Sequence, residues 1–193
     1  MLNFEEAMGG TGLHFEVSGS GRVPLICIHG WACDGQQLVE LSRRLANDFR
    51  IFRLDLPGHG RSPLAGLVSD FEGYAQRIAH FAQDHDLERS VLLGHSMGGI
   101  LSMMAAGSGQ LAPRAVINLD GSLPATEGPV LHIGSATPRL HAPKALTAIP
   151  HLKLGQIADT GHFLHIYAAE RVAFMIRRFL ATAISSGQGG LGT

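Results

Sequence analysis

Short apolar runs and amphipathic stretches alternate along the first 120 residues. The run Val23–Ile28 is continuously apolar, as expected of a strand that is covered on both faces. The stretch Phe71–Asp84 places Tyr74, Ile78 and Phe81 on one side at helical spacing, which predicts a helix. The same two patterns predict further strands at 13–18, 50–54, 91–93 and 114–119, and helices at 34–48, with Asp34 as N-cap, and at 100–106. This alternation predicts an α/β fold, a mostly parallel sheet covered by helices on both faces.

The pattern changes after residue 120. The next apolar run, 130–133, predicts a strand, but only the Gly- and Pro-containing segment 121–129 precedes it. Parallel crossovers usually take a dozen or more residues and contain a helix, so either this link is a bare loop or the strand assignment is wrong. The remaining pattern predicts a short helix at 143–149, a strand at 151–157, a loop at 159–163 and an amphipathic helix at 168–184 with Val172, Met175, Ile176 and Phe179 facing inward. We expect one domain over residues 1–193, with a flexible Gly-rich tail at 185–193.

The composition is that of an ordinary globular protein. The chain has 193 residues, 45% hydrophobic and 16% charged, and a net charge of −1, which recommends neither nucleic acid nor an anionic membrane as a partner. No signal peptide or membrane-spanning run is evident, and Cys27 and Cys33 make no disulfide framework, so we expect a cytoplasmic protein. The eleven histidines show no metal-site spacing, and we expect most of them at the surface. The oligomeric state stays open.

The segment Gly94-His95-Ser96-Met97-Gly98 carries the clearest chemical signal. It matches the G-x-S-x-G elbow and lies between a predicted strand and a predicted helix, as that motif requires. Such a turn holds its serine in a strained conformation, and Gly94 and Gly98 are needed because a Cβ there would collide with neighbouring elements. The Ser96 hydroxyl and the free N–H of Met97 would then lie at a helix N-terminus, where an anion is stabilised. The alternative is a Gly-rich turn with a bystander serine.

Four polar residues fall at or just beyond the ends of predicted parallel strands: His29, Asp55, Ser96 and Asp120. Parallel sheets bind ligands outside the carboxyl ends of their strands. The sequence therefore predicts that these residues gather at one edge of the sheet, and that a functional site lies there.

With these pieces in place, the sequence resembles the α/β-hydrolase family. The resemblance rests on four segments that occur in family order: His29-Gly30-Trp31, Asp55 to Ser62, Gly94 to Gly99, and Gly161-His162-Phe163. It implies that Ser96 is the nucleophile, that His162 is the general base, and that the backbone N–H groups of Met97 and Trp31 form the oxyanion hole. It also implies substrate contacts by Trp31 and Gly30, and neither a cofactor nor a metal.

The histidines next to these motifs are expected to be structural. His29 would hold the oxyanion loop, His59 belongs to a loop signature of the family, and the side chain of His95 should point away from Ser96.

The acidic member of the triad departs from the family pattern. Thr137 stands where the family usually has its acid, and no Asp or Glu occurs from residue 128 to residue 156. A minority of the family carries the acid one strand earlier, which makes Asp120 the preferred candidate. Asp159 is the alternative, although a residue so close to His162 must fold back to reach its ring. Asp55 is interpreted as a structural residue that holds its own loop.

The helical lid of the family is also missing, because the segment 121–129 is too short to contain one. A lid excludes water and holds substrate by apolar contact. Its absence predicts an open cleft, loose specificity, a high KM and a preference for small activated acyl esters.

The first functional hypothesis is a carboxylesterase that cleaves small acyl esters through an acyl-enzyme. One alternative is a cofactor-free ring-cleaving 2,4-dioxygenase of the hydroxyquinolone type, suggested by Trp31 after His29-Gly30 and by the early acid. Another is a perhydrolase, suggested by Trp31 and Met97. A third is a catalytically weak, cap-less hydrolase core that serves as a scaffold.

Overall fold

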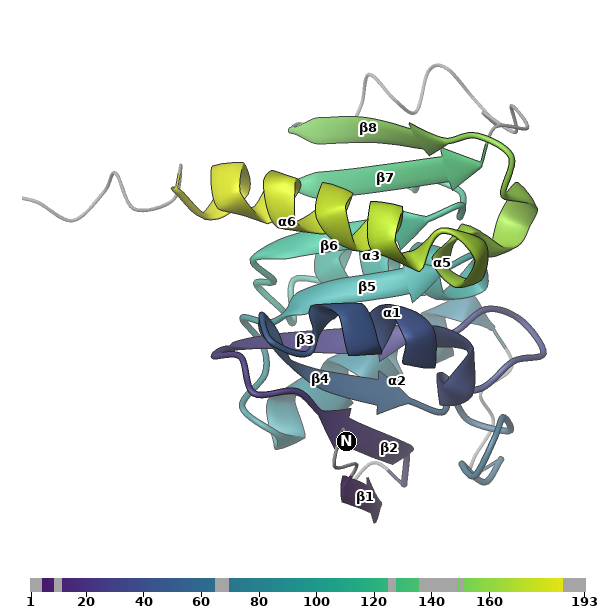
Figure 1. The fold of residues 1–193 in the computed structure, drawn as a ribbon. Coiled ribbons are helices and arrows are strands. Elements are labelled where there is room, and N and C mark those ends of the chain that lie inside the picture. The colour runs from purple at the N-terminus through teal and green to yellow at the C-terminus, as the bar shows by residue number, and fades with distance from the viewer. Residues whose placement is uncertain are drawn as a thin grey trace, which may run out of the picture.

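A computed structural model describes residues 5–8, 12–64, 70–124, 128–135, 149 and 151–185. Within this part of the chain, eight strands form one sheet in the order β1-β2-β4-β3-β5-β6-β7-β8 (Figure 1). The strands are β1 (Glu5–Met8), β2 (His14–Ser18), β3 (Val23–Ile28), β4 (Phe49–Leu54), β5 (Val91–His95), β6 (Ala115–Leu119), β7 (Val130–Ser135) and β8 (Leu152–Ile157).

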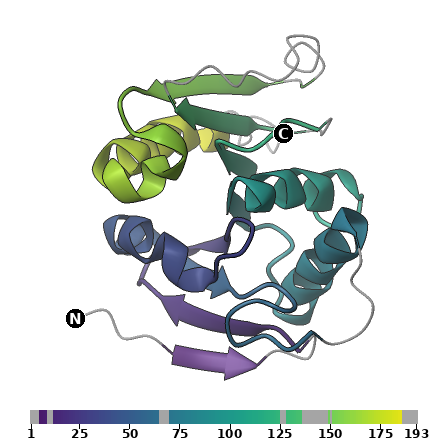
Figure 2. The same cartoon turned by 90° about the vertical axis from the view of Figure 1, so that its right-hand side faces the viewer.

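The sheet is mostly parallel, as predicted. Strand β1 pairs with β2, and β2 with β4, in antiparallel fashion, and every other pairing is parallel. The register sets Ile28 beside Gly94, and His95 beside Leu119. The parallel strands therefore end together at one edge of the sheet, which faces the viewer in Figure 2.

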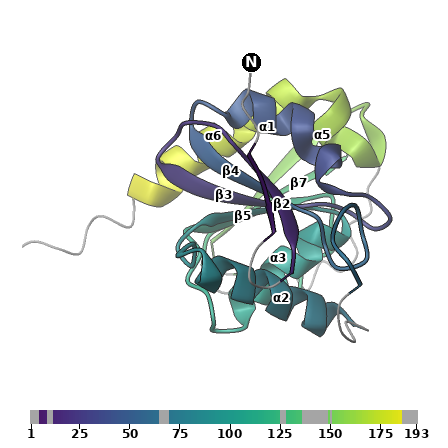
Figure 3. The same ribbon diagram turned by 90° about the horizontal axis from the view of Figure 1, so that it is seen from below.

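Helices cover both faces of the sheet (Figure 3). They are η1 (Gly35–Leu38), α1 (Val39–Leu45), α2 (Phe71–Asp84), α3 (Met97–Gly107), η2 (Gly161–Phe163), α5 (Leu164–Tyr167) and α6 (Ala169–Ser185). Helices α2 and α3 pack on one face, where Ile78, Phe81 and Leu101 are fully buried. Helices α1 and α6 pack on the other face, where Leu41 and Val172 lie in a second apolar cluster.

The strongly patterned elements match the predictions closely. Helix α2 has the predicted bounds, and its Tyr74, Ile78 and Phe81 are buried. The strand expected at 130–133 is confirmed as part of β7, a parallel neighbour of β6. The described residues of the link between β6 and β7, 120–124 and 128–129, contain neither helix nor strand, so this link is a loop where it is described.

Other boundaries were wrong. The helix predicted at 34–48 is split into η1 and α1 and ends at Leu45, although the Asp34 side chain does cap it by accepting from the Gln36 N–H. Part of the loop predicted at 159–163 is the short helix η2, and β1 and α5 were not predicted. These elements have three or four residues each, which is too few to show a hydrophobic period.

Some predictions fall outside the described residues. They are residues 143–148 of the short helix expected at 143–149, the residue Thr137, and residues 186–193 of the tail expected at 185–193. Among the described helices, none combines the length and the apolar character needed to cross a membrane.

Candidate active site

The predicted elbow forms at the junction of β5 and α3. Ser96 has φ 53° and ψ −115°, a conformation that L-residues rarely adopt. A Cβ on Gly94 would lie 2.0 Å from the Gly98 carbonyl oxygen, and a Cβ on Gly98 would lie 2.3 Å from the Ile28 carbonyl oxygen. Only glycine fits at both positions, so the strained turn predicted from the motif is confirmed.

The structure brings His162 and Asp120 together at the same edge of the sheet. The His162 Nδ1 lies 2.7 Å from Asp120 Oδ2, and their side chains are 40% and 12% exposed. With Nδ1–H donating to the carboxylate, the Nε2 of His162 is left as a proton acceptor. Asp159, the alternative acid, lies exposed in the turn before η2 and makes no hydrogen bond to His162. The carboxylate that meets the imidazole is therefore Asp120.

The Asp120 carboxylate is held in its ionised form. It follows β6 with φ 53°, and its Oδ1 accepts from the Ser135 backbone N–H at 3.0 Å. Burial raises the pKa of this carboxyl, but the hydrogen bonds from His162 and Ser135 outweigh burial, and the pKa lies below its usual value. Asp120 is therefore a carboxylate at neutral pH, as an imidazolium partner requires.

Ser96, Asp120 and His162 line one cavity of about 260 Å³. Its other described lining residues are Ile100, Gly121, Ser122 and His132. The side chain of Asn118 fixes the loop beside the cavity, since its Oδ1 accepts from the Gly121 N–H at 2.8 Å and its Nδ2 donates to the Ser122 carbonyl at 2.9 Å. The Ser96 hydroxyl makes no hydrogen bond to a described residue, a common state of such groups without substrate.

The loop after β3 is anchored by His29. The buried ring donates from Nδ1 to the Gly30 carbonyl at 2.8 Å, and its Nε2 accepts from the Leu56 N–H at 3.0 Å. Burial lowers the pKa of His29, so the ring is neutral and both nitrogens are occupied by the backbone. The Gly30 N–H donates to Gln37 Oε1 at 2.8 Å, which ties the loop to η1. These contacts confirm the structural interpretation of His29.

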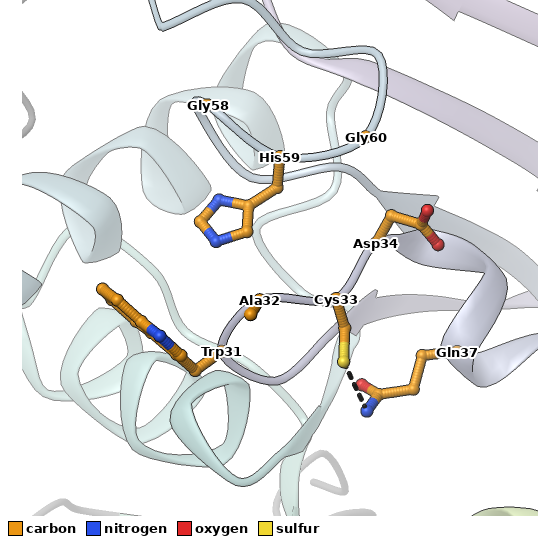
Figure 4. A pocket seen from close by; sticks show the side chains of 8 residues that line it. All are labelled: Trp31, Ala32, Cys33, Asp34, Gln37, Gly58, His59 and Gly60. Atoms are coloured by element: carbon orange, nitrogen blue, oxygen red, sulfur yellow. Dashed lines mark hydrogen bonds between the residues drawn. The ribbon is translucent and has the colours of Figure 1, made fainter.

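Trp31 and His59 both line an open pocket of about 640 Å³ (Figure 4). Their rings lie edge to face with centroids 6.2 Å apart, and Trp31 is 67% exposed. The His59 Nδ1 donates to the Pro57 carbonyl at 3.0 Å.

Met97 is the first residue of α3, where the first N–H groups have no partner within the helix. Trp31 lies in the loop after β3. The end of β3 closely approaches the start of α3, because a Cβ on Gly98 would lie only 2.3 Å from the Ile28 carbonyl oxygen.

A histidine cluster lies beneath the loop that carries His162. The His95 Nε2 donates to the His162 carbonyl at 2.8 Å, and the His95 and His165 ring centroids are 4.2 Å apart. Burial lowers the pKa of His95 to about 4 and that of His165 to about 3, so both rings are neutral. His95 therefore packs and bonds beneath the loop and supports the elbow structurally, as predicted.

The expectation that most histidines lie at the surface was wrong for the described part of the chain. The buried ones are His14, His29, His95, His132 and His165. His14 bonds the Asp55 carboxylate, and His29 and His95 bond backbone groups, whereas His132 and His165 have no hydrogen-bond partner among the described residues.

The sequence analysis missed two residues of the site, His132 and Ser135. A signal was available for His132, because it interrupts the apolar run Val-Leu-His-Ile of β7, as Asn118 interrupts β6. The register places Asn118 and His132 beside each other. A lone polar side chain in a strand buried on both faces marks a site or a satisfied contact.

A family model described as "Alpha/beta hydrolase family" matches residues 25–181. A dihydrolipoyllysine-residue acetyltransferase component of an acetoin cleaving system, from Pseudomonas putida, is 37% identical over 105 residues, which is 54% of this chain and 28% of that protein. A pimeloyl-[acyl-carrier protein] methyl ester esterase from Pectobacterium carotovorum is 34% identical over 94 residues, 49% of this chain and 35% of that protein. The matches thus span about a third of these relatives.

Solved structures show the same fold over nearly the whole chain. A thermophilic esterase from Thermogutta terrifontis aligns with a TM-score of 0.77 and 17% identity, covering 94% of this chain and 99% of that one. Cfl2 from Burkholderia cenocepacia aligns with a TM-score of 0.80 and 15% identity, covering 93% and 96%. Together with the match over residues 25–181, the fold and the elbow lead to one assignment. The chain belongs to the alpha/beta hydrolase family.

Proposed function

We propose that this chain hydrolyses small carboxylic esters through an acyl-enzyme, with Ser96 as nucleophile, His162 as general base and Asp120 as the acid that orients it. The observation that carries the proposal is the 2.7 Å contact between His162 Nδ1 and Asp120 Oδ2 beside the cavity that Ser96 lines. The name of the Pectobacterium relative, a methyl ester esterase, supports the same class of substrate.

Acylation uses the Ser96 hydroxyl and the Nε2 of His162. The Ser96 oxygen attacks the ester carbonyl carbon while its proton moves to His162 Nε2, and the carbonyl π electrons move onto the oxygen. Asp120 stabilises the imidazolium that forms. The tetrahedral intermediate then collapses, the bond to the alkoxy oxygen breaks, and His162 returns the proton to the departing alcohol.

Deacylation repeats the sequence with water. His162 accepts a proton from water as the water oxygen attacks the acyl carbon. Collapse of the second intermediate breaks the bond to Ser96, which regains its proton from His162, and a carboxylic acid is released. In both steps the N–H groups of Met97 and Trp31 are proposed to face the oxyanion, where each preorganised donor contributes several kcal/mol.

The open pocket beside the loop after β3 supports small substrates. We propose that substrate contacts Gly30 and the exposed indole of Trp31, which lines this pocket of about 640 Å³. Because little apolar surface encloses the substrate there, we expect weak binding and a high KM.

The test is hydrolysis of p-nitrophenyl acetate by the parent, by Ser96→Ala and by Ser108→Ala as a matched control. Ser108 is an exposed serine at the other end of α3. We expect Ser96→Ala to lose at least about 10³-fold in kcat, and Ser108→Ala to lose nothing. Equal rates for the parent and Ser96→Ala would contradict the proposal.

The contact with Trp31 has its own test. Trp31→Ala keeps the backbone N–H, so kcat should change little, whereas the KM for p-nitrophenyl esters should rise about three- to tenfold through lost contact with the ring. An unchanged KM would remove the indole from the substrate site. A kcat that falls with KM unchanged would mean that the substitution moved the oxyanion loop instead.

A further inference from the structure

The inner wall of the Ser96 cavity is polar. Of its described lining residues only Ile100 has an apolar side chain, and His132 and Ser122 face the space beside the Ser96–Asp120–His162 group. His132 comes from the middle of β7 and is 9% exposed. It is therefore a second imidazole in the cavity, and the proposed ester hydrolysis assigns it no role.

The His132 ring has no partner within the described part of the chain. Its Nδ1 is sealed from solvent without a hydrogen bond, and its Nε2 makes none either. Nε2 is accessible to solvent. It lies beside Gly134, 3.3 Å from the position that a Cβ on that residue would take. A buried polar group without a partner reduces folding stability, so its presence in a cavity calls for an explanation outside the fold. A substrate group in the cavity would supply the missing partner.

The chemistry of the His132 ring restricts which substrate group can bind it. Burial lowers the pKa of His132 although the Asp120 carboxylate opposes this, so the imidazole is neutral. Because no described residue fixes its tautomer, Nε2 can either donate or accept a hydrogen bond. A hydroxyl, which also does both, fits such a group. An anionic substituent does not, because the ionised Asp120 lines the same cavity.

The size and position of the cavity restrict the substrate further. A volume of about 260 Å³ lies below the roughly 300–1,000 Å³ of pockets that enclose drug-sized ligands, so only a short chain fits. The acyl group stays bonded to Ser96 in the intermediate, and Ser96 lines this cavity. On that ground we place the acyl part of the ester in the cavity.

From the unpartnered imidazole beside Ser96 we infer that the site selects esters of short acyl groups that carry a hydroxyl, and that His132 Nε2 hydrogen-bonds this hydroxyl. The inference rests on the proposed ester hydrolysis and names its substrate class. His132 is thereby a specificity-determining residue.

The test compares methyl 3-hydroxybutyrate with methyl butyrate, two esters that differ by one hydroxyl. The measured quantity is the ratio of their kcat/KM values in the parent, His132→Leu and His132→Gln. We expect a ratio that favours the hydroxylated ester in the parent and falls about five- to tenfold in His132→Leu, the size of one neutral hydrogen bond. His132→Gln, which keeps a hydrogen-bonding amide, should retain most of the preference. His80→Leu, a matched change at an exposed position of α2, should leave the ratio unchanged.

Two results would overturn the inference while leaving ester hydrolysis in place. The first is an unchanged ratio in His132→Leu; if both kcat/KM values fall by the same factor, His132 acts through Asp120 instead. The second is a dependence on a hydroxyl in the alcohol part, tested with 2-hydroxyethyl butyrate. Thermal unfolding of each variant checks that it is folded, and His132→Ala, which also removes the hydrogen-bonding group, provides the same comparison if His132→Leu is not folded. If no variant shows Ser96-dependent turnover of either ester, the proposed function itself fails.

Discussion

The structure contains two histidine–aspartate pairs with similar Nδ1–Oδ2 distances at the same edge of the sheet. His14 Nδ1 lies 2.9 Å from Asp55 Oδ2, and His162 Nδ1 lies 2.7 Å from Asp120 Oδ2. Asp55 follows β4, and Asp120 follows β6. The pairs differ in exposure: the His14 and Asp55 side chains are 9% and 8% exposed, whereas that of His162 is 40% exposed.

The partners of the carboxylates explain the difference. Asp55 also accepts from the Gly35 N–H at 2.7 Å and from the Arg61 N–H at 2.9 Å, so it joins three segments of backbone and the His14 ring. The other nitrogen of His14 is approached by Arg61 Nη1 at 3.4 Å. In the second pair, His162 lines a cavity together with Ser96. A histidine–aspartate contact is therefore not by itself a catalytic arrangement, because the distal nitrogen must also be open towards a nucleophile.

The largest predicted effect separates the pairs by activity. Asp120→Asn can neither hold His162 in the required tautomer nor stabilise its imidazolium, so kcat on p-nitrophenyl acetate should fall about 10⁴-fold. Asp159→Asn is the matched control and should leave kcat unchanged, since Asp159 is exposed and does not bond to His162. Steady-state kinetics on both variants check this. A larger loss in Asp159→Asn than in Asp120→Asn would overturn the assignment.

Much of this comparison could be predicted from the sequence. Strand ends place Asp55 and Asp120 at the same edge, and the absence of an acid from residue 128 to residue 156 leaves Asp120 as the preferred partner of His162. The burial of His165 could not be predicted. It depends on packing against residues distant in sequence, such as His95, and a single imidazole carries no periodic signal. The short elements β1 and α5 escaped for a related reason, because four residues do not complete a pattern.

The second predicted effect is a pH dependence of the free energy of unfolding, because two buried histidines lie beneath the loop that carries His162. His95 and His165 have pKa values of about 4 and about 3 in the folded protein, lowered first by burial. In the unfolded chain a histidine has a pKa of about 6.5. At a pH between the folded and the unfolded pKa, the unfolded state therefore binds more protons than the folded state. The free energy of unfolding should therefore fall as the pH drops below about 6.5, by up to about 1.4 kcal/mol per pH unit for each such histidine.

Urea unfolding at pH 7, 6 and 5 measures this slope. His165→Leu removes one of the two groups and should reduce the slope by about 1 kcal/mol per pH unit, without loss of stability at pH 7, because both nitrogens of His165 lack a described partner. The exposed His80→Leu should leave the slope unchanged. The same slope in the parent and in His165→Leu would mean that the histidines beneath the His162 loop do not set the acid sensitivity.

The smallest effect tests the other pair, and it should appear in stability rather than in rate. Asp55→Asn keeps one carbonyl oxygen but turns an amide N–H₂ towards groups that also donate, the N–H of Gly35 on one side or that of Arg61 on the other. We expect a loss of about 1–3 kcal/mol in the free energy of unfolding, measured in urea, because a buried donor loses its acceptor. The kcat of the folded fraction should stay within about threefold of the parent, since Asp55 and His14 do not line the Ser96 cavity. A fall in kcat as large as that of Asp120→Asn, in a protein that remains folded, would show that the two pairs are coupled and that exposure does not distinguish them.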